Sequence, residues 1–313
     1  MIKNLNWVKR TLFLLSLLFL LIPGTAKAQR QNIYLLGYNG GYQSAVQAPP
    51  GVYMQELVLQ YFNQGIKDQN GNRILNNLDL DFTFWGNNFS WVSPIHFLGA
   101  NYGINLLIPF SNPTLDFGSV IGRQASNFGL SDMYFEPLSL GWHTPHVAVT
   151  FSYGAFFPTG RFTPGSPNNL GRGTWTHLLN LGATVFFDKE HTFSLTNYLR
   201  GEIHQGTRDT TLTLGPDLIW EWSLGKTFAH LLDVSAVGYG EWQVGDNHGG
   251  IPIFPTTHQR VYGVGGEIGV TIPQVRSRLA LRGYGQFGGV LHTQGPGFYL
   301  TFSSGLWNYK PKK

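Results

Sequence analysis

Charged residues recur at alternate positions in several stretches of this sequence. Arg200, Glu202 and His204 are two residues apart, and Asp217 and Glu221 follow in the next stretch of the same kind. Side chains two apart on a β-strand point the same way, and neighbouring strands lie about 4.8 Å apart, so these five can form one charged ladder. With similar positions elsewhere, the candidate substrate-binding or lumen-lining residues are Asp79, Asp81, Arg200, Glu202, His204, Asp217, Glu221, Arg278 and Arg282. Such a ladder can guide solutes through a pore or fill its interior with paired charges, and the sequence leaves both open.

Other patterns that could carry chemistry are weak. The stretch Gly283 to Gly288 reads G-x-G-x-x-G, but it lies inside an alternating segment rather than before a helix, so we expect no nucleotide site. His143 and His146 flank a short turn without a cysteine or a suitably spaced acid, and we expect turn residues rather than metal ligands. Neither G-x-S-x-G nor H-E-x-x-H occurs. We therefore predict no catalytic residue, no enzyme activity, no metal and no cofactor.

The stretches that carry these charges have one apolar and one polar face. From Phe193 to His204 apolar residues alternate with polar and charged ones, and the stretch from Thr211 to Leu224 repeats the pattern. A period of two is typical of β-strands. We predict twelve strands, beginning near Val52. Around residues 78 to 84, Leu and Phe are expected on the apolar face, opposite Asp79 and Asp81.

The gaps between the predicted strands alternate in length. The long gaps are Asn63 to Asn76, Phe110 to Leu130, Pro158 to Gly173, Gly245 to Gln259 and Gly288 to Gly297; only Gln205 to Asp209 is shorter than expected for its class. The others are tight turns, such as Thr144-Pro145-His146. Tight turns at one end and long loops at the other are typical of outer-membrane barrels. The fold prediction is therefore all-β: a transmembrane, antiparallel, up-and-down β-barrel of about 12 strands.

Two local features support or refine this prediction. The phase of alternation slips at Glu136-Pro137, which indicates a β-bulge. Tryptophans are expected in girdles near the strand ends, as lipid-facing barrels require. We place Trp91, Trp142, Trp220, Trp222 and Trp307 at the turn ends, and Trp175 and Trp242 at the loop ends.

Composition excludes other classes of protein. Charged residues make up 12% of the chain and aromatic residues 15%, which disfavours disorder, while 40 glycines disfavour a helical bundle. Four basic residues and no acid lie in the first 28 residues, so the remainder is neutral, with 17 of each sign. The net charge of +4 therefore gives no reason to expect a nucleic-acid partner.

The first 28 residues have the three parts of a secretory signal. A basic run precedes an apolar stretch of 12 residues, and Ala26-Lys27-Ala28 forms the expected cleavage site. The predicted organisation is a cleaved signal peptide (1–28), an N-terminal segment (29–50), a transmembrane barrel (51–309) and a basic tail (310–313). The segment 29–50 either enters the lumen as a small plug or hangs in the periplasm, and its aromatic content favours the plug.

Several motifs with Gly and Pro lie at predicted strand ends between about Pro49 and Phe187. They are Pro49-Pro50-Gly51-Val52-Tyr53, Tyr61-Phe62, Asp68-Gln69-Asn70-Gly71-Asn72, Phe128-Gly129-Leu130-Ser131-Asp132, Pro137-Leu138-Ser139-Leu140-Gly141-Trp142-His143, Phe157-Pro158-Thr159-Gly160-Arg161 and Asn169-Leu170-Gly171-Arg172-Gly173. They resemble the outer-membrane family named for the meta-pathway of phenol degradation. The resemblance implies a barrel that passes small hydrophobic, often aromatic, compounds, and it implies no phenol-degrading activity.

We therefore expect an outer-membrane channel or transporter in a Gram-negative bacterium. Its partners would be outer-membrane lipid, small hydrophobic molecules and the barrel-assembly machinery. Two alternatives remain: a barrel enzyme acting on lipid, with Ser, His and Asp or Asn at the lipid-facing rim, and a soluble secreted β-protein that binds sugars.

Overall fold

Strands form almost all of the regular structure. The computed structural model describes residues 34–62, 65, 67–73, 79–116, 123–125, 127–166, 168–249 and 258–309. The predicted signal peptide and basic tail lie outside these residues. Twelve long strands are β1 (Gly51–Phe62), β2 (Asp79–Phe97), β3 (Ala100–Asp116), β6 (Met133–His143), β7 (Val147–Phe157), β8 (Thr176–Phe186), β9 (Phe193–His204), β10 (Asp217–Phe228), β11 (Leu232–Gln243), β12 (Arg260–Ile272), β13 (Ser277–Val290) and β14 (Gly297–Asn308). Short pieces are β4 (Arg123–Ala125), β5 (Gly129–Leu130) and the 3-10 turn η1 (Pro273–Val275).

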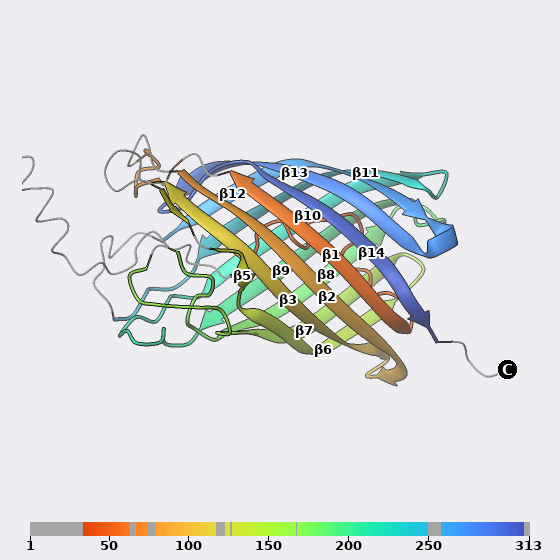
Figure 1. The fold of residues 1–313 in the computed structure, drawn as a ribbon. Helices are drawn as coiled ribbons and strands as arrows, with labels where there is room; N and C mark the ends of the chain where they lie inside the picture. Colours follow the sequence, from red (N-terminus) through yellow and green to blue (C-terminus); the bar gives the residue numbers. More distant parts are fainter. Residues whose placement is uncertain are drawn as a thin grey trace, which may run out of the picture.

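The twelve long strands close into one antiparallel barrel. Each pairs with its neighbour in the chain, β3 pairs with β6, and the last strand β14 returns to the first, β1. Closure leaves no open sheet edge between the first and last strands, which is the condition for crossing a bilayer with strands. Figure 1 shows the tilted strands, with β1 and β14 side by side. In the described part of the chain, no helix is long and apolar enough to cross a membrane.

Connection length separates the two ends of the barrel. At the inner end, where β1 begins and β14 ends, the connections are short, as between β2 and β3 or β6 and β7. The outer end carries the long loops. The short gap predicted at Gln205 to Asp209 was wrong: β10 begins only at Asp217, and Leu212 and Leu214 lie in a loop with an isolated bridge at Thr213. Leu212 and Leu214 alternate with polar residues as they would in a strand. The backbone between them does not extend β10, because Thr213 forms isolated bridges with Gly206 and with His248.

Two further boundaries differ from prediction. β3 continues past Phe110 to Asp116, because β2 also extends outward and pairs with it along its whole length. Trp220 and Trp222 both lie in the outer half of β10, not at its turn end, because that strand starts at Asp217 and ends at Phe228. The bulge at Glu136-Pro137 is confirmed by the register shift between β6 and its neighbours.

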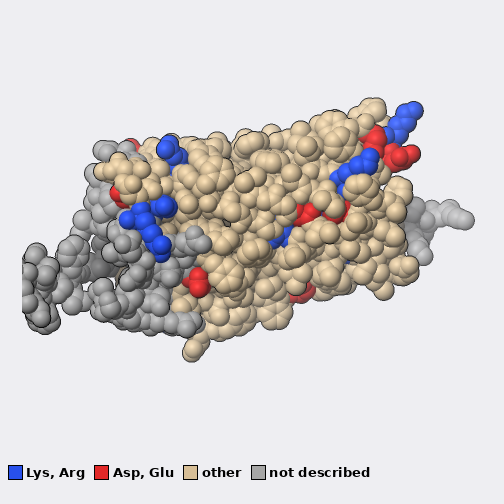
Figure 2. Space-filling view, turned by 90° about the horizontal axis from the view of Figure 1, so that it is seen from above, with Lys and Arg blue, Asp and Glu red and all other residues tan. Residues whose placement is uncertain are grey.

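The outer surface of the barrel is apolar. On β9 and β10, Leu199, Ile203, Trp220 and Leu224 are exposed, whereas the alternate residues Arg200, Glu202, Glu221 and Ser223 are buried. Figure 2 shows a face that is largely uncharged between the two ends, apart from a short oblique row of charges. A soluble sandwich buries its apolar face, so this surface favours the membrane barrel over the soluble alternative.

The two faces of β2 are opposite to those predicted. Phe82 and Phe84 point inward, because they pair with the buried Tyr61 and Leu59 and line the internal cavity described below. Asp81 alternates with them and therefore lies on the outer face. It was wrongly assigned to the lumen, because the inner surface is apolar at this point. The side chain of Asp79 lies outside the described residues.

Candidate functional site: an occupied lumen and the cavity beside it

The segment from Tyr34 to Pro50 lies inside the ring of strands, where it is visible as the red-orange coil in Figure 1. It is folded into successive tight turns. Backbone N–H groups donate to the carbonyl three residues earlier at Tyr38 (3.0 Å), Gly40 (3.3 Å), Ser44 (3.2 Å) and Val46 (3.0 Å). Some backbone N–H and carbonyl groups of the segment therefore bond to each other, and others bond to side chains of the barrel wall.

The first anchor of this segment is a carboxylate and a guanidinium on adjacent strands. Glu221 accepts hydrogen bonds from the Tyr34 hydroxyl (2.8 Å) and the Gly37 N–H (2.7 Å). The Arg200 guanidinium lies over the Tyr34 ring, 3.5 Å from its centroid, and its Nε donates to Asn180 Oδ1 at 2.5 Å. All are buried, so the end of the segment is held by charge-assisted contacts shielded from water.

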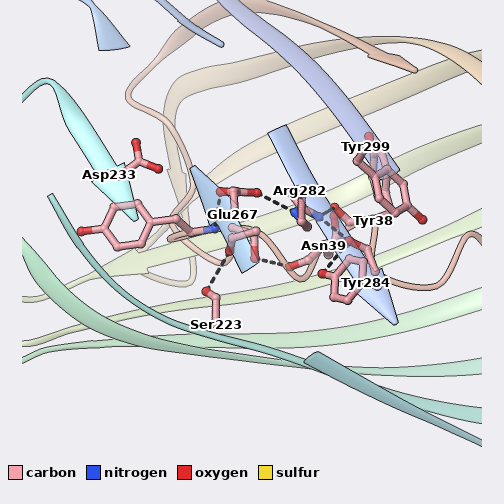
Figure 3. Close-up of polar contacts among 12 residues, drawn as sticks. Tyr38, Asn39, Ser223, Asp233, Glu267, Arg282, Tyr284 and Tyr299 are labelled. Carbon is pink, nitrogen blue, oxygen red and sulfur yellow. Dashed lines mark hydrogen bonds and ion pairs between the residues drawn. The ribbon is translucent and has the colours of Figure 1, made fainter. Parts of the chain in front are cut away.

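The second anchor is centred on Arg282 and Glu267. Arg282 donates to the carbonyls of Gly37 and Tyr38, and its Nε lies 2.5 Å from Glu267 Oε2. Glu267 also accepts the Tyr42 N–H at 3.1 Å. Figure 3 shows the surrounding side chains converging on the segment; they include Ser223, Tyr284 and Tyr299, and Ser223 and Tyr299 donate to the carbonyls of Gly41 and Leu36.

Arg278 completes this second group on the wall. It forms a two-pronged contact with Asp233 (3.0 and 2.5 Å) and binds Glu267 at 2.6 Å. Glu267 is therefore shared by two guanidinium groups, which balances the charges of β11, β12 and β13.

The inner end of the segment is held by the turns. The Tyr42 hydroxyl donates to the Thr192 carbonyl (2.8 Å), and Gln43 donates to the carbonyl of His191 (2.8 Å). His143 Nε2 lies 2.9 Å from the Gln47 carbonyl. His143 thus contacts the segment as a polar turn residue. The adjacent turn is closed by Asp188, where hydrogen bonds from Thr192 lower the pKa of the carboxyl group.

The predicted ladder is divided in two by the segment. Glu202, His204 and Asp217 lie together at the outer end, with Asp217 directly opposite Glu202 across the strand pair. Arg200 and Glu221 meet through Tyr34 instead. The sequence could not indicate this, because Tyr34 lies 187 positions before Glu221 in the chain.

Close packing makes one glycine of the segment sensitive to substitution. Gly37 has φ +90°, and a Cβ there would lie 2.5 Å from Tyr284 Cε2. We expect Gly37→Ala to displace the segment and raise single-channel conductance in planar bilayers, because alanine both strains this backbone and collides with the ring. Gly201→Ala is the matched control, since a Cβ at Gly201 meets nothing within 4 Å. Equal conductance in both variants would contradict a tight fit.

A cavity of about 1280 Å³ runs beside the segment. It extends from outer-loop residues near Leu170 to inner-end residues near Asn308. Its apolar wall comes from both the segment and the barrel: Leu35, Val46, Met54, Phe82, Phe84, Leu107, Phe156 and Leu178. Its polar wall includes Arg200 and Glu136, and the latter accepts hydrogen bonds from Tyr134, Ser152 and Asn105.

Sequence reasoning missed this apolar wall and Glu136. The sequence did contain a sign of this wall, because β1 and β2 carry apolar residues on both faces. A prediction based on alternation treats only one face of each strand as apolar, so it overlooked the second. Glu136 lies in the predicted bulge, which turns its side chain inward.

Three of the loop motifs meet at the outer mouth. Asp132 accepts the N–H groups of Gly160 (2.9 Å) and Arg172 (2.6 Å). A Cβ on Gly171 would lie 2.3 Å from Asp132 Oδ1 and 2.9 Å from the Gly160 Cα, so glycine is needed for this approach. Burial raises the pKa of the Asp132 carboxyl group although both N–H groups oppose the shift. The motifs thus shape one loop over the cavity.

Comparison with known proteins agrees with this architecture. Residues 64–302 match the family described as "Putative MetA-pathway of phenol degradation". Since the match spans most of the sequence, the chain belongs to this family. A comparison with curated proteins gave no match.

Solved structures also resemble the barrel. An outer membrane channel from Pseudomonas putida F1 superposes with a TM-score of 0.69 at 11% identity, covering 84% of this chain and 98% of that one. The CymD monoaromatic hydrocarbon channel gives a TM-score of 0.47 at 10% identity, covering 91% and 98%. A Pseudomonas aeruginosa FadL homologue gives 0.42 at 10% identity, covering 90% and 98%. The first similarity supports the outer-membrane barrel fold.

Proposed function

We propose that this member of the phenol-degradation family is an outer-membrane channel for small hydrophobic, often aromatic, compounds. The observation that carries the proposal is the cavity between the inner segment and the wall formed by β1, β2, β3 and β7. Binding sites for small molecules are usually concave and mostly apolar, with a few polar groups that fix orientation. This cavity has that character, with Phe84, Leu107 and Phe156 as apolar lining and Glu136 as a polar group in the same wall.

In this proposal the segment 34–50 is a plug. Its contacts occupy the part of the lumen lined by β9, β10, β12 and β13, where Arg200, Glu221, Glu267 and Arg282 bind it. We infer that these charged residues hold the plug and that solutes pass on its opposite, apolar side. Arg278 binds Glu267, and with Arg200 and Arg282 it also lines the cavity.

The substrate class follows from the wall. Aromatic rings and aliphatic side chains favour an uncharged, flat or compact molecule, because contacts with them do not replace the hydration that a charged solute would lose. The Glu136 carboxylate and the tyrosine hydroxyls beside it offer hydrogen bonds to one polar group on such a molecule.

The lipid-enzyme alternative has less support. It requires a histidine and an acid beside a serine at the lipid-facing rim. The His–carboxylate pairs of the described residues fall into three groups: His204 with Glu202 and Asp217, His292 with Glu241, and His258 with Asp246. The first two groups are buried and the third is in an outer loop, away from the apolar belt.

The proposal predicts that filling the cavity slows uptake. We expect Leu107→Trp to lower the rate at which intact cells accumulate radiolabelled toluene several-fold, because Leu107 is buried and lines the cavity. Leu106→Trp is the matched control, since the preceding residue points to the opposite face of β3. Heat-modifiable migration in gels checks that both variants fold. Equal uptake by the two folded variants would mean that toluene does not use this cavity.

A further inference from the structure

One acidic side chain interrupts the apolar outer surface of the barrel. Glu56 is the sixth of the twelve residues of β1, on the face that it shares with the exposed Val58 and Phe62. The other outward Asp, Glu, Lys and Arg side chains of the described strand residues lie within three residues of a strand end; they are Asp81, Lys226 and Arg260. Glu56 is therefore the one charge of the described strands that faces the middle of the lipid layer, and such residues usually have a function.

Glu56 is held in position by the strand beside it. Its Oε2 accepts the Trp85 indole N–H at 2.6 Å, and Asn87 is directly opposite it across β1 and β2. The Asn87 amide donates one hydrogen bond, to the Ile108 carbonyl at 3.2 Å. Among the described residues, neither the second Glu56 oxygen nor the Asn87 side-chain carbonyl has a hydrogen-bond partner. Unpaired polar groups are unfavourable in hydrocarbon, so this polar pair indicates a partner in the membrane.

An aromatic surface surrounds the polar pair. Trp85 stacks on Phe128 with ring centroids 6.3 Å apart, and Phe128 stacks on Phe110 at 5.8 Å. Phe89 on β2 and Phe302 on β14 are also exposed. Figure 1 shows β14, β1 and β2 side by side, as their pairing requires. A broad aromatic surface with a polar centre suits contact with another protein, because packing and hydrogen bonds drive association in lipid.

The chemistry of the polar pair identifies the partner. Lipid tails carry no hydrogen-bond donor for the free Glu56 oxygen. The pair itself is self-complementary, because an acceptor on β1 lies beside an amide on β2 that still has one hydrogen to donate. A two-fold axis along the membrane normal brings the same patch of two copies together at the same depth and in the same orientation.

We propose that this outer face of β1 and β2, with the neighbouring rings of β3 and β14, joins two copies of the chain in the outer membrane. Glu56 of each copy accepts a hydrogen bond from Asn87 of the other, and the exposed aromatic rings pack around the two pairs. The contact removes the carboxylates from lipid. This inference concerns the outer surface of the barrel and does not depend on the solute that the cavity passes.

The test uses a single thiol, which can be placed at will because the sequence contains no cysteine. Val58→Cys puts the thiol beside Glu56, and Leu199→Cys puts it on the exposed face of β9, in another part of the wall. Outer membranes that contain either full-length variant are treated with a short bis-maleimide. We expect a covalent dimer of twice the chain mass for Val58→Cys and only monomer for Leu199→Cys.

A second substitution distinguishes a specific contact from random collisions in the membrane. Glu56→Leu, added to Val58→Cys, removes the acceptor and should lower the dimer yield several-fold. Asn197→Leu, added to Val58→Cys, is the matched control and should leave the yield unchanged. Asn197 is an outward polar residue of β9 that also accepts a tryptophan indole N–H, from Trp220 at 3.1 Å. Heat-modifiable migration in gels checks that each variant folds.

Three results would overturn the proposal. The first is a dimer yield for Val58→Cys no higher than for Leu199→Cys, which would leave this face to lipid. The second is an adduct of another mass, which would assign the face to a different protein, and the third is a dimer yield that Glu56→Leu does not change. If Glu56→Leu does not fold, native mass spectrometry of the unsubstituted protein decides: a dimer supports the contact, and monomer alone overturns it.

Discussion

Removing residues 34–46 should open the barrel to ions and small polar solutes. The deletion takes away the backbone groups and the Tyr34 ring that Glu221, Arg282 and Arg200 bind, and it leaves every strand pair and the apolar outer surface unchanged. We expect single-channel conductance in planar bilayers to rise roughly tenfold, because a twelve-stranded barrel without its filling is wide enough for a water-filled path. Liposome swelling with small sugars should rise in parallel.

A loop deletion of similar kind provides the control. Removal of residues 208–211 shortens the outer loop between β9 and β10, where Thr207 and Leu212 are already bonded to each other. Conductance should stay low in this variant. If the folded plug deletion conducts no better than the native protein, other parts of the lumen close the pore and the segment is not its main barrier.

Arg200→Ala should have the next largest effect. The substitution removes the guanidinium from the face of Tyr34 and leaves Asn180 Oδ1 without its donor. A desolvated cation–π contact contributes about 2 kcal/mol, equivalent to about a 30-fold shift between the bound and released plug. We expect a barrel that still folds, since its outer surface is untouched, but one with frequent openings in single-channel records and faster solute flux.

The Arg200 prediction has a direct comparison on the same barrel. Arg260→Ala removes an exposed guanidinium at the outer end of β12 and should leave the records unchanged. Loss of heat-modifiable folding in Arg200→Ala would show that the residue is needed to assemble the wall. Unchanged flux through a folded barrel would assign Arg200 to structural filling alone.

The residue pattern alone determined the wall over most of its length. In β9, β10, β13 and β14, strict alternation placed Arg200, Glu221 and Arg282 inside and their apolar neighbours outside. This works because a strand between lipid and a polar interior has two different solvents, and each solvent selects its own side chains.

The alternation of apolar and polar residues gave the wrong orientation of a strand where the barrel interior is apolar. Asp81 was placed in the lumen, whereas Phe82 and Phe84 occupy that side. A strand with similar solvents on both faces carries no sequence signal for its orientation. In the loop before β10, short-range alternation at Leu212 and Leu214 looked like a strand, because a pattern of a few residues does not reveal which partner the backbone will bind.

Only the tertiary structure decided where the N-terminal segment lies and what it separates. Its composition allowed a plug, but its anchors come from positions 96 to 263 residues later in the chain, and no local pattern encodes such contacts. The same segment splits the charged ladder into a plug anchor and a group of Glu202, His204 and Asp217, and it leaves an apolar passage on the opposite side. Sequence periodicity records the average solvent on each face of a strand, whereas the lumen is shaped by which distant side chains meet there.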